Sequence, residues 1–339
     1  MRSPKGCAAI VILPLMAFGN DLGRNSEMNS SPMNHQQTLW TIGGGKGGSG
    51  KSFLAANIGI CLSKLGVQVI LVDADLGGAN LHTLLGIPPP FPSLSDFIQK
   101  KVQNLHDVLI PSGISNLRLL TGTQDLLNSA DVKSLQRRKL LRAIRGLGGD
   151  CIIVDLGGGN AASVLDLFLM SDGGILVVTP EPTSIENTYR FLKSAFYRRL
   201  RQSVSSPSVK SLIDQAMNGK NESGIRNPYE LFREAKRLNL EDANRMMEET
   251  EAFRPNLILN QVQSKKDIEM GFFIRSAYQK YFGIHLHYLG YVVYDQEVGS
   301  SIRKRRPLIL ENERCRASQC ISEIASKLLQ SQMRASSME

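Results

Sequence analysis

The sequence predicts an α/β fold in which a doubly wound, mostly parallel sheet is flanked by helices. Two observations predict this fold. Short runs that are apolar at every position recur along the chain, and segments with helical spacing lie between them. Strands are apolar throughout when helices cover both faces of their sheet. Regular alternation of strand and helix is typical of parallel sheets, because parallel neighbours need a long crossover connection.

Seven apolar runs are predicted as strands, at Leu39–Ile42, Val67–Val72, Leu117–Leu120, Cys151–Val154, Ile175–Val178, Leu257–Leu259 and Tyr288–Val293. Helical spacing predicts helices at Ser52–Leu65, Asp131–Ile144, Ser184–Leu200 and Ser318–Leu329. Two of these helices carry end signals. Gly66 follows the first, as glycine commonly follows a last helical turn, and Asp131 can cap the second.

The stretch 198–256 breaks the alternation, because it contains no convincing strand. Asn227 followed by Pro228 indicates a helix start, with asparagine at the cap and proline in the first turn. We therefore expect one helix at Tyr229–Leu238 and a second at Glu241–Phe253. Together they predict a helical insertion on the rim of the sheet.

Length and composition set the domain organisation. The chain has 339 residues, of which 42% are hydrophobic and 21% charged, as in ordinary globular proteins. This excludes collagen-like, disordered and membrane-spanning classes, and five scattered cysteines do not make a disulfide framework. We expect a disordered leader or a misplaced start over 1–37, one α/β domain over 38–330, and a polar tail over 331–339.

Two stretches account for the net charge of +9. Residues 131–146 contain six basic side chains and one acidic, and residues 300–320 contain six basic and two acidic. Solvated faces of a globular protein explain such stretches. The alternative is a patch for nucleic-acid phosphates or anionic lipid headgroups.

A glycine-rich segment joins the first predicted strand to the first predicted helix, and it reads Gly45-Lys46-Gly47-Gly48-Ser49-Gly50-Lys51-Ser52. The pattern G-x-x-x-x-G-K-[ST] in this context binds phosphates, because backbone N–H groups surround them at the positive end of a helix. Lys51 would bridge the β- and γ-phosphates of a nucleoside triphosphate, and the Ser52 hydroxyl would ligate Mg²⁺.

Aspartates follow two further predicted strands. Asp73 and Asp75 come at the end of the second strand, and Asp155 comes at the end of the fourth. The carboxyl ends of parallel strands face the crevice in which ligands bind, and Mg²⁺ prefers oxygen ligands. An apolar strand that ends in aspartate is the Walker B arrangement, so Asp155 would hold Mg²⁺ directly or through water.

Lys46 gives the phosphate loop the form K-G-G-x-G-K-[ST], which resembles the deviant Walker A loop of the MinD/ParA/Mrp ATPases. The segment Asp73-Ala74-Asp75-Leu76-Gly77 resembles the switch I segment of the same family. By this resemblance, Lys46 reaches the nucleotide of a partner subunit in an ATP-sandwiched dimer. The resemblance also implies that Asp75 orients the attacking water and that Asp73 acts near the metal.

The resemblance extends over about 39–330, apart from the insertion. The segment Thr-Pro-Glu-Pro-Thr-Ser at 179–184 looks closest to that of the flagellar-number regulators of the FleN/FlhG type. Asn260 lies in a strand that resembles the one whose asparagine contacts adenine, and Asp295 lies in a loop that resembles the border of the base. One departure is Gly158, where the family usually has proline or alanine. Three consecutive glycines there predict a looser switch II.

The resemblance implies a cytoplasmic switch that binds ATP and Mg²⁺ and forms a homodimer when ATP is bound. It implies slow hydrolysis that an activating protein stimulates, weak peripheral association with the inner membrane, and a role in placing flagella or the division site. Two alternatives stay open. One is a ParA-like partitioning ATPase on non-specific DNA, and the other is a nucleotide-binding scaffold that does not hydrolyse ATP.

Overall fold

The computed structural model describes residues 37–45, 47–75, 78, 80–89, 92–122, 142–217, 225 and 227–336. All of them belong to the compact unit His35–Glu339. Lys46, the leader up to residue 36 and most of the helix predicted at Asp131–Ile144 lie outside the described residues.

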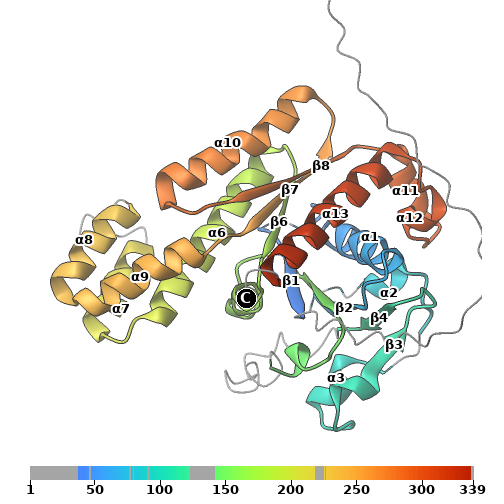
Figure 1. Ribbon diagram of the computed structural model, residues 1–339, viewed down its shortest axis with the longest axis horizontal. Coiled ribbons are helices and arrows are strands. Elements are labelled where there is room, and N and C mark those ends of the chain that lie inside the picture. The colour runs from blue at the N-terminus through green and yellow to red at the C-terminus, as the bar shows by residue number, and fades with distance from the viewer. Residues whose placement is uncertain are drawn as a thin grey trace, which may run out of the picture. The chain divides into compact units, whose positions relative to one another are not determined.

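Eight strands of the described chain form one sheet, in the order β3-β4-β2-β5-β1-β6-β7-β8 (Figure 1). Every neighbouring pair is parallel except β3 and β4, which are antiparallel. This confirms the predicted doubly wound, mostly parallel sheet. The strands are β1 (Thr38–Gly43), β2 (Val69–Ala74), β3 (Leu109–Pro111), β4 (Leu117–Leu120), β5 (Cys151–Leu156), β6 (Ile175–Val178), β7 (Asn256–Val262) and β8 (His287–Val293).

The described helices are α1 (Lys51–Lys64), α2 (Leu81–Leu84), α3 (Leu94–Ile98), α5 (Ala162–Leu169), α6 (Pro182–Ser203), α7 (Pro207–Met217), α8 (Pro228–Leu238), α9 (Leu240–Ala252), α10 (Lys265–Phe282), α11 (Gln296–Arg303), α12 (Leu308–Glu311) and α13 (Arg316–Ser336). A 3₁₀ turn, Leu105–Val108, precedes β3. No described helix combines the length and the apolar character needed to cross a membrane.

Helices cover both faces of the sheet, and this explains why the strands are apolar at consecutive positions. Leu39 packs into a cluster with side chains of α5, α6 and α10, whereas its neighbour Trp40 packs into a second cluster with side chains of α1 and α13. Figure 1 shows α1 and α13 together on one side of the strands. Two cores therefore fix the sheet, and they hold its loops at defined positions.

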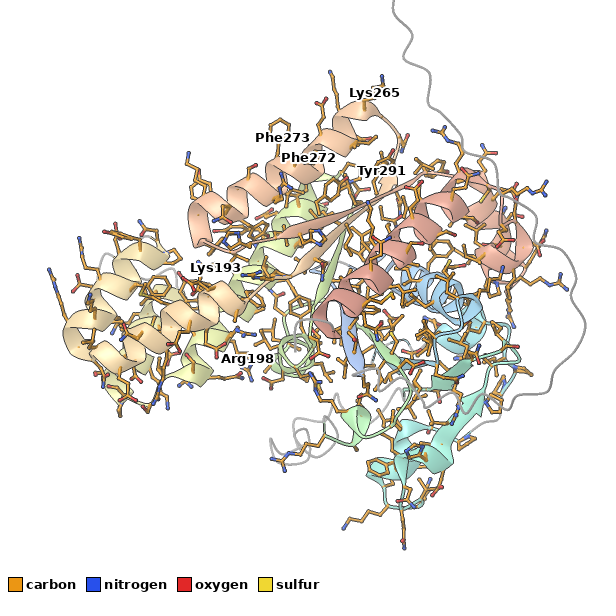
Figure 2. All side chains as sticks on the ribbon, in the orientation of Figure 1. Lys193, Arg198, Lys265, Phe272, Phe273 and Tyr291 are labelled. Carbon is orange, nitrogen blue, oxygen red and sulfur yellow. The ribbon has the colours of Figure 1, made fainter. Side chains whose placement is uncertain are left out.

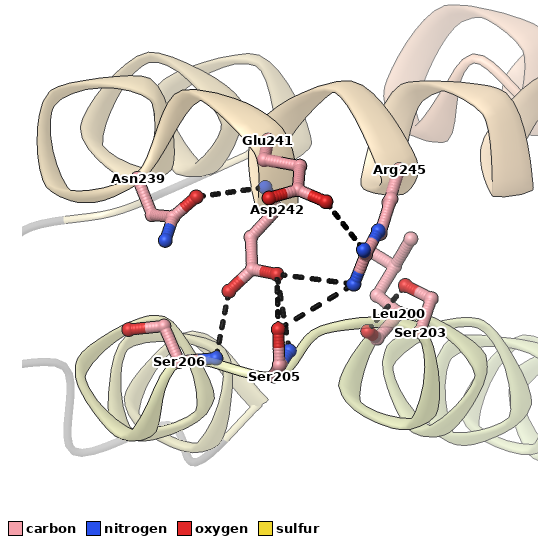
Figure 3. Close-up of polar contacts among 8 residues, drawn as sticks. All are labelled: Leu200, Ser203, Ser205, Ser206, Asn239, Glu241, Asp242 and Arg245. Carbon is pink, nitrogen blue, oxygen red and sulfur yellow. Dashed lines mark hydrogen bonds and ion pairs between the residues drawn. The ribbon is translucent and has the colours of Figure 1, made fainter.

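The described part of the stretch 198–256 consists of helices and their short connections, up to the first residue of β7. Helix α6 continues through Arg198 to Ser203, and α7, α8 and α9 follow before β7. Asn227 caps α8 as predicted, because its side chain accepts a hydrogen bond of 2.9 Å from the Glu230 amide. Asp242 in α9 joins two of these helices: its carboxylate accepts hydrogen bonds from the amides of Ser205 and Ser206 at the start of α7 (Figure 3).

Several features differ from the sequence predictions, which also did not include helices α2, α3, α5, α7, α11 and α12. Three of these features are described here. Strand β3 was not predicted, because three residues that end in Pro111 give no readable pattern. Proline is tolerated there since β3 is an edge strand. Helix α10 was not predicted although Ser264 and Asp267 form a capping box at its start, because the exposed Phe272 and Phe273 obscure its amphipathic pattern. Helix α13 extends past the predicted end to Ser336.

Candidate functional site

The predicted site residues meet at one edge of the sheet. The phosphate loop leaves β1 at its carboxyl end and enters α1, and Ile42 of β1 pairs in register with Asp155 of β5. Asp73 of β2 pairs with Asp155 from the other side. Adjacent parallel strands therefore bring the two aspartates beside the loop, as the sequence predicted.

Close contacts and backbone geometry require several of the glycines in the phosphate loop. A Cβ atom at Gly45 would lie 1.9 Å from the carbonyl oxygen of Asn187 in α6. Gly48 and Gly50 have φ angles of 80° and 91°, in the left-handed region that favours glycine. Gly50 occupies the cap position of α1, and no side chain caps that end. The first turn of α1 can therefore receive an anion.

Asn260 of β7 holds this loop in place. Its side-chain amide donates a hydrogen bond of 2.8 Å to the carbonyl oxygen of Ser49, and the residue is 5% exposed. A Cβ atom at Gly50 would lie 2.3 Å from the same amide nitrogen. The amide thus packs directly against the loop, and Gly50 leaves the space for it.

Lys51 is buried at the first position of α1 and is 6% exposed. Burial lowers the pKa of its ammonium group, while the nearby carboxylates of Asp155 and Asp75 act in the opposite direction. A buried lysine needs negative charge beside it. The two aspartates provide it in the protein alone, and phosphate oxygens would provide it in a complex.

Asp155 has an unusual environment for an acidic residue that is 1% exposed. The Ser52 hydroxyl hydrogen-bonds its carboxyl group, but its Oδ1 atom has no hydrogen-bond partner. Burial and the charge of Asp73 raise its pKa well above the usual value, and Ser52 and Lys51 oppose this rise. A buried oxygen without a partner is costly, so the arrangement fits one that receives a cation.

The donor set fits Mg²⁺ that is shared with phosphates. Ser52 and Asp155 present a hydroxyl and a carboxylate, the hard oxygen ligands that Mg²⁺ prefers. Among the described residues, no group of three or more His, Cys, Asp or Glu side chains could hold a metal ion. A complete protein cage is therefore absent from the described chain. Mg²⁺ commonly takes one or two protein ligands, phosphate oxygens and waters.

Asp73 shapes the segment that carries Asp75. It is fully buried, its Oδ1 atom accepts a hydrogen bond of 3.2 Å from the Asp75 amide, and its Oδ2 atom accepts one of 2.9 Å from the Leu81 amide. Burial raises its pKa to about 7. Asp75 then lies against Gly157 of the segment after β5, where a Cβ atom would be 2.8 Å from its Oδ1 atom. The two predicted switch segments are therefore in contact.

A cavity of about 550 Å³ lies beside the phosphate loop. Its lining includes Gly50, Phe53, Asn260, Tyr294 and Asp295. Its size and its aromatic rings suit a nucleoside attached to phosphates in the loop. The Asp295 carboxylate is already engaged, because it accepts hydrogen bonds from the amide of Glu297 (3.0 Å) and that of Ala317 (3.3 Å).

Comparisons with known proteins identify the family of this chain. Residues 40–308 match the family model described as CobQ/CobB/MinD/ParA nucleotide binding domain. The chain belongs to this family. It is 34% identical over 163 residues to the antiactivator FleN of Pseudomonas aeruginosa. The aligned region covers 47% of this chain and 56% of FleN. The chain is also 33% identical over 153 residues to the septum site-determining protein MinD of Helicobacter pylori. That aligned region covers 44% of this chain and 56% of MinD. The chain thus spans about half the length of these curated relatives.

A solved structure of the same family shares the fold. The septum site-determining protein MinD of Pyrococcus horikoshii, complexed with Mg-ADP, superposes with a TM-score of 0.58. The match covers 86% of this chain and 96% of that one, at 20% sequence identity. At this identity the likeness concerns the fold, and it agrees with the eight-stranded sheet described above.

The structure brings most of the predicted site residues together, and it shows further contacts at the site that were not predicted. Lys51, Ser52, Asp75 and Asp155 share one site, whereas Lys46 lies outside the described residues. The predictions did not include the role of Gly157 in seating Asp75 or the hydrogen bond from Asn260 to the loop. Both are contacts across the sheet edge, so no local sequence signal could have revealed them.

The basic stretch 300–320 is partly neutralised. Lys304 and Arg306 both pair with Glu311, the latter over 3.6 Å. Most of the stretch 131–146 lies outside the described residues.

Proposed function

We propose that this chain is an ATP-dependent molecular switch that pairs with a second copy when ATP is bound and separates after hydrolysis. One observation carries the proposal: the partnerless Oδ1 atom of Asp155 lies next to Ser52, at the uncapped start of α1. A buried carboxylate oxygen and a hydroxyl at a phosphate loop suit a triphosphate with Mg²⁺.

The phosphates bind to the backbone amides of the loop, and Lys51 contributes a cation at the β- and γ-phosphates. Ser52 and Asp155 would hold Mg²⁺, and Asp73 supports the Asp75 segment through its hydrogen bond from the Asp75 amide. Bound Mg²⁺ neutralises charge on the phosphate oxygens. Asp75 orients the attacking water, and its contact with Gly157 passes the state of the γ-phosphate to the segment after β5.

The dimer and the biological process rest on the family. Lys46 reaches the phosphates of the partner copy, and the two nucleotides lie between the subunits. The relatives named FleN and MinD support a role in flagellar number or division-site placement. An activating protein and a weak membrane contact complete this proposed cycle.

The test is a phosphate-release assay on the full chain, combined with sedimentation velocity in ATP and in ADP. The unmodified protein is expected to hydrolyse ATP slowly and to dimerise only with ATP. Lys51→Ala removes nucleotide retention, and Lys46→Ala removes ATP-driven dimerisation while ATP still binds. Unchanged behaviour of both variants would contradict the proposal.

The same assay separates the alternatives. Vesicles or DNA that accelerate hydrolysis would identify the surface on which the switch works. ATP binding without hydrolysis under all conditions would favour the scaffold.

A further inference from the structure

A second polar site lies at the opposite edge of the sheet. A cavity of about 680 Å³ opens where α10 ends and β8 begins, lined by Arg254, Arg275, Lys280, His285 and His287 among others. The strands run in parallel from this edge to the phosphate loop, so the cavity is at their amino ends. It is therefore separate from the nucleotide site.

The lining of this cavity is cationic and has no carboxylate. Most arginines on α6, α8 and α9 form ion pairs with acidic neighbours, as Arg198 does with Asp166. Among the described residues, by contrast, Arg254, Arg275 and Lys280 make no ion pair. Ser276 and Gln279 add neutral donors at the same wall. Unneutralised cations that converge on a cavity create a positive potential that attracts an anion.

The two arginines are held at the cavity by neighbouring groups. The Arg275 guanidinium lies 5.4 Å from the ring centre of Phe272, which packs edge-on against Tyr288 at 5.1 Å. Figure 2 labels Phe272 on α10, next to the exposed Phe273. Arg254 donates from Nε to the carbonyl oxygen of Glu251 at 3.2 Å. Anchored guanidinium groups lose less conformational entropy when they bind an anion.

The pKa of His287 reflects the positive potential at this edge. Its Nδ1 atom lies 3.2 Å from the side-chain oxygen of Asn256. Its pKa is lowered by burial and by the charges of Lys327 and Arg275.

A second cavity of about 470 Å³ shares His287 and Arg254 with the first. It contains one carboxylate, Asp172, which already accepts hydrogen bonds from the Leu39 amide and from Arg145.

We propose that the cavity at the end of α10 binds a phosphate monoester or phosphodiester anion through Arg254 and Arg275. A planar guanidinium group can donate two parallel hydrogen bonds to two oxygens of one phosphate, whereas a lysine ammonium group acts as a point charge. A soluble phosphate compound and a phospholipid headgroup present the same chemistry, and the experiment separates them. The site does not depend on ATP binding at the other edge.

The test uses the full chain with the nucleotide site saturated by Mg-ADP. Glycerol 3-phosphate is titrated calorimetrically, and co-sedimentation is measured with vesicles of phosphatidylglycerol and of phosphatidylcholine. The test variant is Arg254→Gln combined with Arg275→Gln. The control is Arg190→Gln combined with Arg233→Gln, which removes two exposed arginines from α6 and α8. All proteins are checked for unchanged thermal unfolding and unchanged ADP affinity.

The test variant is expected to lose at least tenfold in affinity, and the control is expected to change less than twofold. Loss of glycerol 3-phosphate binding identifies a soluble ligand. Loss of phosphatidylglycerol binding alone identifies a headgroup. Equal binding by all three proteins, or no binding of either probe by the unmodified chain, would overturn the proposal.

Discussion

Two aspartates with the same solvent exposure have opposite environments in this molecule. Asp155 at the sheet edge and Asp242 in α9 are each 1% exposed. For both, burial by itself raises the carboxyl pKa. At Asp242, hydrogen bonds from Ser205 and Ser206 and the charge of Arg245 overcome it, so the pKa lies below the usual value. At Asp155 the pKa stays well above the usual value.

The difference separates a structural carboxylate from the carboxylate that we propose as a Mg²⁺ ligand. Both oxygens of Asp242 accept a backbone N–H, at 3.0 Å from Ser205 and 2.8 Å from Ser206 (Figure 3). The Oδ1 atom of Asp155 accepts none. Folding therefore completes the environment of Asp242. In the proposed function, a bound cation would complete the environment of Asp155, and the complex would then offset its cost to stability.

The largest expected effect comes from Asp155→Asn, which is nearly isosteric and removes the charge. Mg²⁺-dependent ATP hydrolysis should fall at least about 100-fold, because the metal loses a ligand where phosphate charge develops. The free energy of unfolding without nucleotide should change by less than about 1 kcal/mol, because the lost attraction to Lys51 is offset by the removal of a buried charge. Phosphate release at several Mg²⁺ concentrations and urea unfolding measure the two effects. A large loss of stability would show that Asp155 is a structural residue.

The matched change Asp242→Asn should have the reverse effect. Whichever way the new amide is oriented, its NH₂ group faces the amide of Ser205 or Ser206. We expect a loss of about 2–3 kcal/mol in the free energy of unfolding, because a charged acceptor is lost and a buried donor is left without a partner. ATP affinity should stay within twofold. If urea unfolding is unchanged, the network in Figure 3 does not stabilise α9 against the connection between α6 and α7.

This comparison also shows what the sequence could predict. Asp155 was predictable, because an apolar strand that ends in aspartate near a glycine-rich loop is a local pattern. The role of Asp242 was not, since Ser205 and Ser206 lie more than thirty residues earlier, and the packing of α6 on α9 brings the connection after α6 near Asp242. The sheet was predictable because its strands pack into a core on each face, and such strands are apolar at consecutive positions. Strand β3 was too short to show a pattern.

A smaller effect is expected for Gly157→Ala. Its Cβ atom would lie 2.8 Å from Oδ1 of Asp75, so that carboxylate must move by a few tenths of an ångström or more. We expect hydrolysis to fall about 20-fold with ATP affinity unchanged, because misplacing a catalytic group affects the transition state more than binding. Steady-state kinetics give both quantities. Gly146→Ala is the control, since its nearest contact would be an ordinary 3.4 Å. An equal effect of the two changes would contradict the contact between the switch segments.

The smallest effect is expected for Asn260→Ala, and it decides between two roles. The family resemblance predicts a contact with adenine, whereas the structure shows a hydrogen bond to Ser49 of the phosphate loop. Loss of one buried hydrogen bond of about 1 kcal/mol should weaken nucleotide binding about fivefold. If the loop contact is the main role, ATP and GTP affinities fall together, because both carry the same phosphates. If the base contact is the main role, ATP affinity falls and GTP affinity does not. Asn256→Ala, at the far end of the same strand, should leave both affinities unchanged, so the comparison isolates what the amide does beside the loop.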